Sequence, residues 1–239
     1  MSWAKRRGAA LLLAGMLAGC ATSGGNPADP LEPFNRAMFR FNDAVDDVVL
    51  KPVAKGYRAV LPNFVRTGVS NFFSNLEDLW ISFNDFLQGK IQQGSEDFAR
   101  FFINSTFGLL GIFDVASDAD LPKHNEDFGQ TLGRWGLGPG PYLVLPILGP
   151  STVRDGFGFL LDTQADLVWR IDYVPTRNTT YATRAVNTRT NLLDTTNALE
   201  EAALDKYSFV REVWLQRRRN LVYDGDPPRE RTESDEESR

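Results

Sequence analysis

The spacing of apolar side chains predicts helices along most of this chain. Between Leu31 and Val48, apolar residues recur at steps of three and four, which places them on one face of a helix. A second apolar stripe follows residues 72–87 and fills an arc of about 140°, wide enough to face a core. The same periodicity predicts further helices over 52–61, 151–161, 177–192 and 195–221. We therefore expect an all-α fold.

Proline and capping residues mark several helix ends. Asp29 is expected to cap the first helix, with Pro30 at its first position. Pro52 then ends or kinks this helix, and Pro62 opens another. Ser151 and Thr152 are expected to cap the helix that follows them.

Residues 95–116 show a different pattern, because no charged residue lies between Arg100 and Asp114. A helix here is apolar nearly all round and leaves only a narrow stripe of Arg100, Asn104, Gly108 and Gly111. Such a helix is either deeply buried or immersed in lipid. Two interpretations stay open: a central helix of a bundle, or a helix with apolar faces toward acyl chains. In the second, Arg100 and Asn104 are candidates for lining a polar passage.

A Gly/Pro-rich stretch over 133–150 interrupts the helices. Nine of its eighteen residues are glycine or proline, which excludes a long helix. Since most of the others are apolar or aromatic, we expect a hairpin with Tyr142–Leu145 as a strand-like arm. The hairpin is a candidate gate, and the alternative is a buried connection between helices. The candidate gate residues are Gly138, Pro139, Gly140, Pro141, Tyr142 and Leu143, and the flanking Arg134 and Arg154 are candidate channel-lining residues that could meet a phosphate.

The amino terminus has the pattern of a bacterial lipoprotein signal. A basic head precedes an apolar run from Gly8 to Gly19, which is typical of a secretory signal peptide over residues 1–19. The following Cys20 is the only cysteine, and Leu17–Cys20 resembles a lipobox, where the thiol takes a diacylglycerol before cleavage. An ordinary secretory signal with an incidental cysteine is the alternative. No aspartate follows Cys20, which favours the outer membrane as the destination of the lipid-anchored chain.

Charge and composition divide the rest of the chain. The whole chain carries 26 basic and 31 acidic side chains, which argues against a nucleic-acid partner. Residues 20–28 are expected to form a lipidated tether and 29–223 one helical domain. The acidic stretch 224–239 has no aliphatic or aromatic residue, so it is expected to be disordered.

The chain offers few residues for catalysis or for cofactor and metal binding. His124 is the only histidine and is expected at the surface of a polar loop. No Gly-x-Ser-x-Gly nucleophile motif occurs. We therefore expect no enzymatic activity, no cofactor and no metal.

Three stretches resemble the MlaA/VacJ family of outer-membrane lipoproteins. These stretches are Asp29–Arg36, Asn71–Leu76 and the longer run from Glu126 through Pro146 to Ser151, in family order behind the lipobox. The resemblance covers about residues 29–215 and leaves out the tether and the tail.

The resemblance implies a ring-like helical protein in the periplasmic leaflet of the outer membrane, beside a trimeric porin. It also implies an amphipathic channel through which misplaced phospholipids leave the outer leaflet for a periplasmic carrier, MlaC. Such a protein maintains the lipid asymmetry of the outer membrane. A structural lipoprotein scaffold and a lipid-hydrolysing enzyme are the alternatives.

Overall fold

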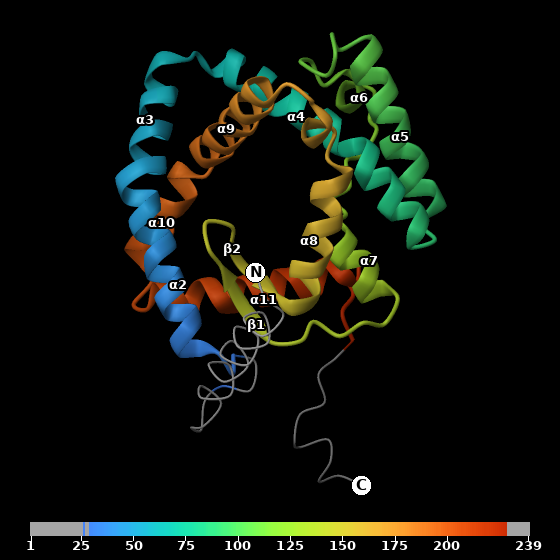
Figure 1. Cartoon of the computed structure of the whole chain (residues 1–239). Helices are drawn as coiled ribbons and strands as arrows, with labels where there is room; N and C mark the ends of the chain where they lie inside the picture. The colour runs from blue at the N-terminus through green and yellow to red at the C-terminus, as the bar shows by residue number, and fades with distance from the viewer. Residues whose placement is uncertain (1–25, 27–28, 229–239) are drawn as a thin grey trace, which may run out of the picture.

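The computed structural model describes residue 26 and residues 29–228. The expected signal peptide, Cys20 and most of the acidic tail lie outside these residues. In the described part, helices are arranged as a ring around a small two-stranded sheet (Figure 1). The predicted all-α, ring-like fold with a Gly/Pro-rich hairpin is therefore confirmed.

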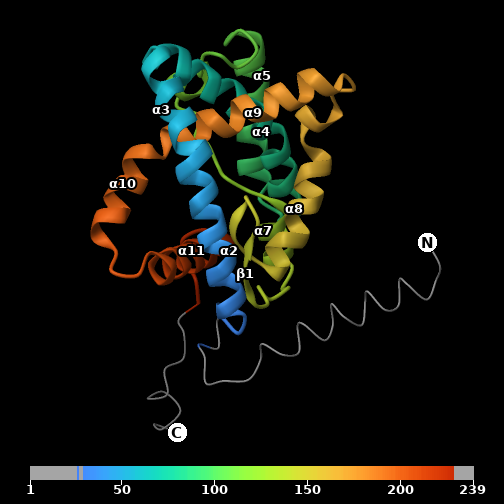
Figure 2. The same ribbon diagram turned by 60° about the vertical axis from the view of Figure 1, so that its left-hand side comes forward.

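One side of the ring is a long helix with a bend. Helix α2 (Glu32–Val45) passes through a π-helical turn (Asp46–Leu50) into α3 (Lys51–Val60) without leaving helical geometry (Figure 2). Pro52 lies just after this turn, and such turns let a helix continue past a residue that lacks a backbone N–H. Of the two predicted outcomes at Pro52, the kink is the one that occurs.

Helices α4 (Asn63–Leu87) and α5 (Ile91–Thr106) pack side by side on the opposite side. The prediction of a helix from Ser95 to residue 116 is wrong at both ends. At Gly108 an added Cβ would lie 2.1 Å from the carbonyl oxygen of Phe113, so the chain turns where only glycine fits. Leu109, Leu110 and Gly111 then have positive φ angles, which no α-helix accommodates.

The remaining elements close the ring. They are α6 (Val115–Asp118), α7 (Phe128–Arg134), β1 (Tyr142–Leu145), β2 (Gly149–Thr152), α8 (Val153–Ala165), a 3₁₀ turn (Leu167–Arg170), α9 (Val174–Asn191), α10 (Leu193–Ala202) and α11 (Lys206–Val222). Thr152 caps α8 by accepting a hydrogen bond from the Asp155 amide, as predicted. The helix predicted over 195–221 is two helices, because Asp205 caps a new helix start.

The β-hairpin is antiparallel, with Tyr142 opposite Thr152 and Leu145 opposite Gly149. Its strand β1 buries Tyr142 and Val144 against Tyr207 of α11, and Met38, Phe39, Trp214 and Leu215 pack around this cluster. The hairpin is thereby fixed to α2 and α11, and its tip rises inside the ring (Figure 1).

Asp29 has a different role from the predicted helix cap. Helix α2 begins at Glu32 and no side chain caps it. The Asp29 carboxylate is buried and accepts hydrogen bonds from Asn35 Nδ2 at 2.8 Å, from Arg211 Nη1 at 3.0 Å and from the Tyr207 hydroxyl. A buried charge needs such partners, and here they join the start of α2 to α11.

Candidate functional site

Polar groups fill the interior of the fold, and apolar groups cover much of its surface. Among the described residues, twenty polar or charged side chains are buried but only ten apolar ones. Many large apolar side chains are exposed, among them Phe64, Phe102, Phe107, Leu110 and Phe157. This reverses the usual distribution for a protein surrounded by water. Exposed apolar surface on this scale indicates contact with lipid or with another protein.

No helix of the described part is both long and apolar enough to cross a bilayer.

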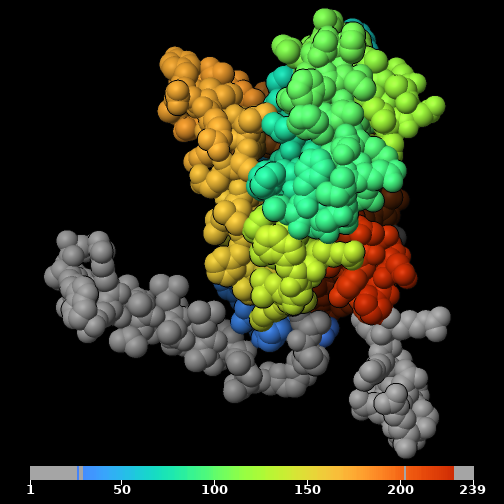
Figure 3. All heavy atoms as spheres, turned by 90° about the vertical axis from the view of Figure 1, so that its right-hand side faces the viewer, coloured from blue at the N-terminus to red at the C-terminus, as the bar shows by residue number. Residues whose placement is uncertain are grey.

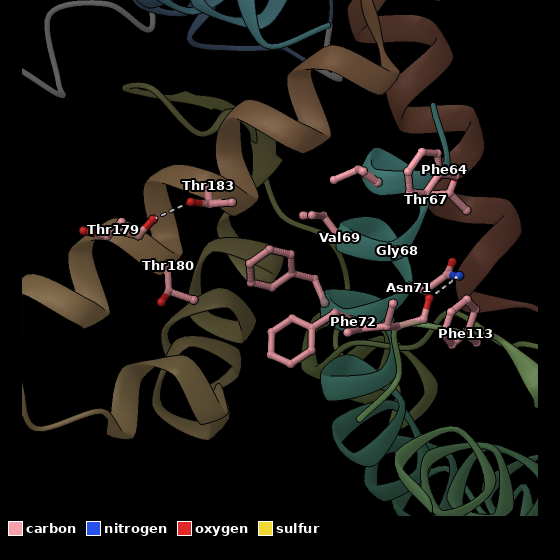
Figure 4. Close-up of a pocket in the computed structure, with 13 residues that line it drawn as sticks. Phe64, Thr67, Gly68, Val69, Asn71, Phe72, Phe113, Thr179, Thr180 and Thr183 are labelled. Carbon is pink, nitrogen blue, oxygen red and sulfur yellow. Dashed lines mark hydrogen bonds between the residues drawn. The ribbon is translucent and has the colours of Figure 1, made fainter. Parts of the chain in front are cut away.

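An apolar hollow of about 870 Å³ lies between the first half of α4 and the middle of α9 (Figure 4). Phenyl rings of Phe64, Phe72 and Phe113 and the side chain of Val69 form most of its wall. The other lining residues are Val65, Thr67, Gly68, Asn71, Phe73, Ile112, Thr179, Thr180 and Thr183. Its size and apolar lining suit a hydrocarbon chain.

Helix α9 provides the polar side of this hollow. The hydroxyls of Thr179, Thr180 and Thr183 each donate to the backbone carbonyl four residues earlier, at 2.8 to 2.9 Å. Their oxygens retain lone pairs, so this border offers weak hydrogen-bond acceptors and no charge. Thr179 and Thr183 also border a second hollow of about 530 Å³ between α3 and α9. Sequence reasoning missed these residues, although their spacing on the predicted helix places all three close together.

The structure corrects the roles predicted for Arg100 and Asn104. Both side chains are buried, at 1% and 3% exposure. Arg100 donates twice to Asp114, at 2.9 and 3.0 Å, and once to the Leu121 carbonyl, while Asn104 Nδ2 donates to Asp114 at 3.0 Å. The polar stripe therefore binds the chain segment around α6. Arg100 and Asn104 therefore bind protein groups, and they do not line the water-accessible passage that was one of the two predictions.

The two other predicted channel residues have different surroundings. Arg154 is 6% exposed, and its guanidinium donates to Asp155 at 2.9 Å. Arg218 of α11 also binds Asp155 at 2.9 Å and Asp127 at 2.6 Å, so Arg154 belongs to a buried charge network between α7, α8 and α11. Arg134 is exposed at the end of α7, and its contact with a phosphate stays a prediction.

Two asparagines of α2 hold the hairpin. Asn35 donates to the Tyr142 carbonyl at 3.0 Å and accepts from the Val144 amide at 2.8 Å. Asn42 repeats this pair two turns later, with the Leu145 carbonyl at 2.8 Å and the Ile147 amide at 2.7 Å. Asn35 thus satisfies a backbone donor and a backbone acceptor of β1, and Asn42 does the same for the end of β1 and the turn that follows it. Asn42 is a residue that sequence reasoning missed.

The predicted gate residues divide between the body of the protein and its surface. Tyr142 is buried and Leu143 is half-buried, whereas the Gly138–Pro141 run is exposed. Backbone amides of Val153 and Arg154 donate to the carbonyls of Pro141 and Pro139, which holds this run at the start of α8. At the tip, Ile147 has a φ of 66°, which is unusual for a β-branched residue. Whether the hairpin acts as a gate stays a prediction.

His124 is not the surface histidine that the sequence predicted. Its ring is only 19% exposed, and Nδ1 lies 2.8 Å from the buried carboxylate of Asp97. The surrounding loop carries the ring inward between α4 and α5, an arrangement that a polar local sequence does not indicate.

A buried carboxylate gives the stability of the fold a measurable pH dependence. Burial raises the pKa of Asp162 from 3.8 to about 6, even though hydrogen bonds from Trp80 Nε1 and the Phe128 amide favour its charged form. A carboxyl whose pKa is higher in the folded state stabilises the fold fully below its unfolded pKa. This stabilisation is lost as the pH rises through about 6.

We therefore expect Asp162→Asn to be more stable than wild type above pH 6, by about 1–3 kcal/mol, and equal to it near pH 4. The asparagine oxygen still accepts both hydrogen bonds. Thermal unfolding in detergent from pH 4 to 8 measures the difference. Burial also raises the pKa of Asp78 to about 6, and comparing the two chains cancels that background. A variant that is less stable at every pH would contradict the prediction.

Comparisons with known proteins match the chain to one family. A family model described as MlaA lipoprotein matches residues 27–221. The chain is 37% identical over 218 residues to the intermembrane phospholipid transport system lipoprotein MlaA of Escherichia coli (strain K12), covering 88% of this chain and 86% of that protein. The protein of the same description from Haemophilus influenzae is 34% identical over 225 residues, covering 90% of each chain.

A solved structure has a similar fold. It was reported as the structural basis for maintenance of bacterial outer membrane lipid asymmetry. The TM-score is 0.72 at 38% sequence identity, and the match covers 81% of this chain and 98% of the other.

Proposed function

This chain belongs to the MlaA lipoprotein family, and on that premise we propose that it removes mislocalised phospholipids from the outer leaflet of the outer membrane and so maintains its lipid asymmetry. The observation that carries the proposal is the apolar hollow between α4 and α9, bordered by threonine hydroxyls. Acyl chains gain about 0.8 kcal/mol for each methylene that leaves water, so an apolar wall retains them. Moving a lipid needs no bond to be broken, so we propose transport without enzymatic activity.

The apolar surface supports a position within the membrane interface. We propose that a lipid anchor at Cys20 holds the chain at the periplasmic leaflet of the outer membrane, with its exposed phenylalanines among acyl chains. A lipid head group avoids hydrocarbon, because an unpaired polar group there costs several kcal/mol, so we propose that it passes through the opening of the ring while the exposed apolar side chains contact acyl chains.

Two protein partners follow from the family resemblance. We propose that a trimeric porin lies beside the ring and that a periplasmic carrier of the MlaC type receives the lipid. The apolar faces of α3 and α5 are suited to such contacts, because the side chains of Val53, Val60 and Phe102 are exposed there.

We also propose that the hairpin tip gates the lipid route. Asn35 and Asn42 hold the backbone of β1 and of Ile147, whereas the side chains of Ile147 and Leu148 at the tip are exposed. A tip with large apolar side chains inside the ring can contact a passing acyl chain.

Filling the hollow tests the transport proposal. Thr180→Trp places an indole in the hollow, and displacing even two methylenes of a bound chain costs about 1.6 kcal/mol, roughly tenfold in occupancy. We expect cells that depend on this variant to accumulate phospholipid in the outer leaflet, measured by its sensitivity to an added phospholipase.

Thr176→Trp is the matched control, because Thr176 lies one turn earlier on α9 at an exposed position. It should clear phospholipid as wild type does. Normal clearance by a folded, membrane-bound Thr180→Trp chain would contradict the role proposed for the hollow.

A further inference from the structure

Three potential metal ligands from separate segments meet on the outer side of the ring. Asp85 lies near the end of α4, Asp97 lies on α5, and His124 belongs to the loop between α6 and α7. One ligand atom from each lies within 4.8 Å of the other two. Figure 3 shows this outer side, on which α5 and α7 lie one above the other.

Asp85 lacks the partners that a buried carboxylate requires. Its side chain has 0% exposure, and neither carboxylate oxygen accepts a hydrogen bond from a donor group among the described residues; its side-chain neighbour is the Asp97 carboxylate, with which only a shared proton would make a hydrogen bond. The positive charge of Lys90 is near Asp85. The Lys90 ammonium, however, is paired with Glu126, at 2.9 Å, and with Asp224. An uncompensated charged carboxylate in such a place is strongly destabilising, so Asp85 requires either a cation beside it or a proton.

Asp97 and His124 are held in a ligating arrangement. Asp97 is fully buried, and its Oδ2 lies 2.8 Å from His124 Nδ1, while its Oδ1 accepts from the His124 backbone amide at 3.3 Å. The other imidazole nitrogen, His124 Nε2, lies 3.8 Å from Glu96 Oε2, a distance that allows a charge interaction but is longer than a hydrogen bond. Metal-binding histidines commonly direct their second nitrogen to a carboxylate, which sets the tautomer and the orientation of the ring.

The chemistry of the three donor groups indicates which metal ions the site can bind. Two carboxylates and one imidazole give oxygen and nitrogen donors without a thiolate, which suits Zn²⁺ and related transition metals. Ca²⁺ takes six to eight oxygens, and Mg²⁺ demands octahedral oxygen geometry, so both fit three mixed donors poorly. We propose that Asp85, Asp97 and His124 bind one divalent transition-metal ion of the Zn²⁺ type, with water as a further ligand.

The ion links three segments that are distant in the sequence. It connects the end of α4 and the first half of α5 to the loop that leads into α7, and its positive charge neutralises the two carboxylates. Binding to the folded chain alone then stabilises the fold in proportion to the logarithm of the free ion concentration.

The alternative is a proton shared between the carboxylates. Burial and the negative charges of Glu126 and Asp97 raise the pKa of Asp85, which makes a neutral Asp85 the competing state. The two states differ in their response to substitution. An asparagine at position 85 replaces a protonated acid at little cost, but it removes a charged ligand from an ion.

The test uses the complete lipoprotein in detergent, stripped with a chelator and titrated with Zn²⁺ by calorimetry. We expect one equivalent to bind, a rise in the unfolding temperature, and little competition from Mg²⁺ or Ca²⁺. Asp85→Asn and His124→Gln should each lower Zn²⁺ affinity by about 100-fold or more, and Glu96→Gln, a positioning substitution, by about 10–100-fold. Asp118→Asn, at an exposed acid on α6, controls for surface binding and should change nothing.

Circular dichroism shows whether each variant is folded before it is titrated. Absence of stoichiometric Zn²⁺ binding by wild type would overturn the proposal. So would equal affinity in the Asp85→Asn and Asp118→Asn chains. An Asp85→Asn chain that is more stable than wild type in the presence of Zn²⁺ would instead establish the shared proton.

Discussion

Replacing Cys20 with serine is expected to abolish nearly all outer-leaflet phospholipid clearance. A serine hydroxyl does not take the diacylglycerol that a lipobox thiol takes, so we expect an unprocessed or soluble chain without acyl chains. Each buried methylene contributes about 0.8 kcal/mol, so two or three acyl chains account for almost permanent attachment to a bilayer. Without them, the concentration of the protein at the membrane falls by orders of magnitude. Mass spectrometry of the amino-terminal peptide and membrane fractionation measure the two effects.

The matched control for this substitution is Thr22→Ser, two residues further along the chain. It should be acylated, cleaved before Cys20 and fully active. An unmodified Cys20 in active wild-type protein would contradict the prediction, as would full activity of the soluble Cys20→Ser chain.

A disulfide between α2 and the hairpin tip is expected to block lipid movement reversibly. Asn42 and Ile147 are the candidate pair, because Asn42 Oδ1 accepts a hydrogen bond from the Ile147 backbone amide at 2.7 Å and the two residues are therefore neighbours. The hairpin contacts α2 and α11, so a disulfide that locks it is best placed between it and one of these helices.

We expect the oxidised Asn42→Cys, Ile147→Cys protein to bind to membranes and fold normally while transporting little lipid. Reduction of the same protein should restore most of the transport, which makes the reduced form its own control. Each single cysteine variant should be insensitive to the oxidant. Undiminished transport by the oxidised protein would remove the gate proposal and leave the hairpin as a buried connection.

The general architecture was accessible from the sequence because it depends on local signals. Apolar periodicity located α2, α4 and α8, and the glycines and prolines of residues 133–150 identified the hairpin and its strand β1. Proline patterns alone did not decide between a break and a kink at Pro52. The helix continues through a π-helical turn just before Pro52. Asp46, in this turn, binds Arg189 at 2.6 Å, and these two residues are 143 positions apart in the sequence.

The site residues were harder to predict because a polar stripe has two physical explanations. A helical wheel places Arg100 and Asn104 together, but water and a buried carboxylate satisfy them equally well. The deciding partner, Asp114, lies beyond a turn that required Gly108 and Gly111 to leave the helix. The threonine border of the hollow and the inward position of His124 likewise depend on contacts between distant segments.

The polar interior has a thermodynamic consequence. Unfolding raises the heat capacity where apolar surface becomes hydrated and lowers it where polar surface does. Fewer apolar than polar side chains are fully buried in the described part of this fold, and many large apolar side chains are already exposed. Its heat-capacity change on unfolding should therefore fall below the usual value of about 12–15 cal/mol/K per residue. A smaller value flattens the curve of free energy against temperature, so the ring keeps a nearly constant stability from cold to warm surroundings.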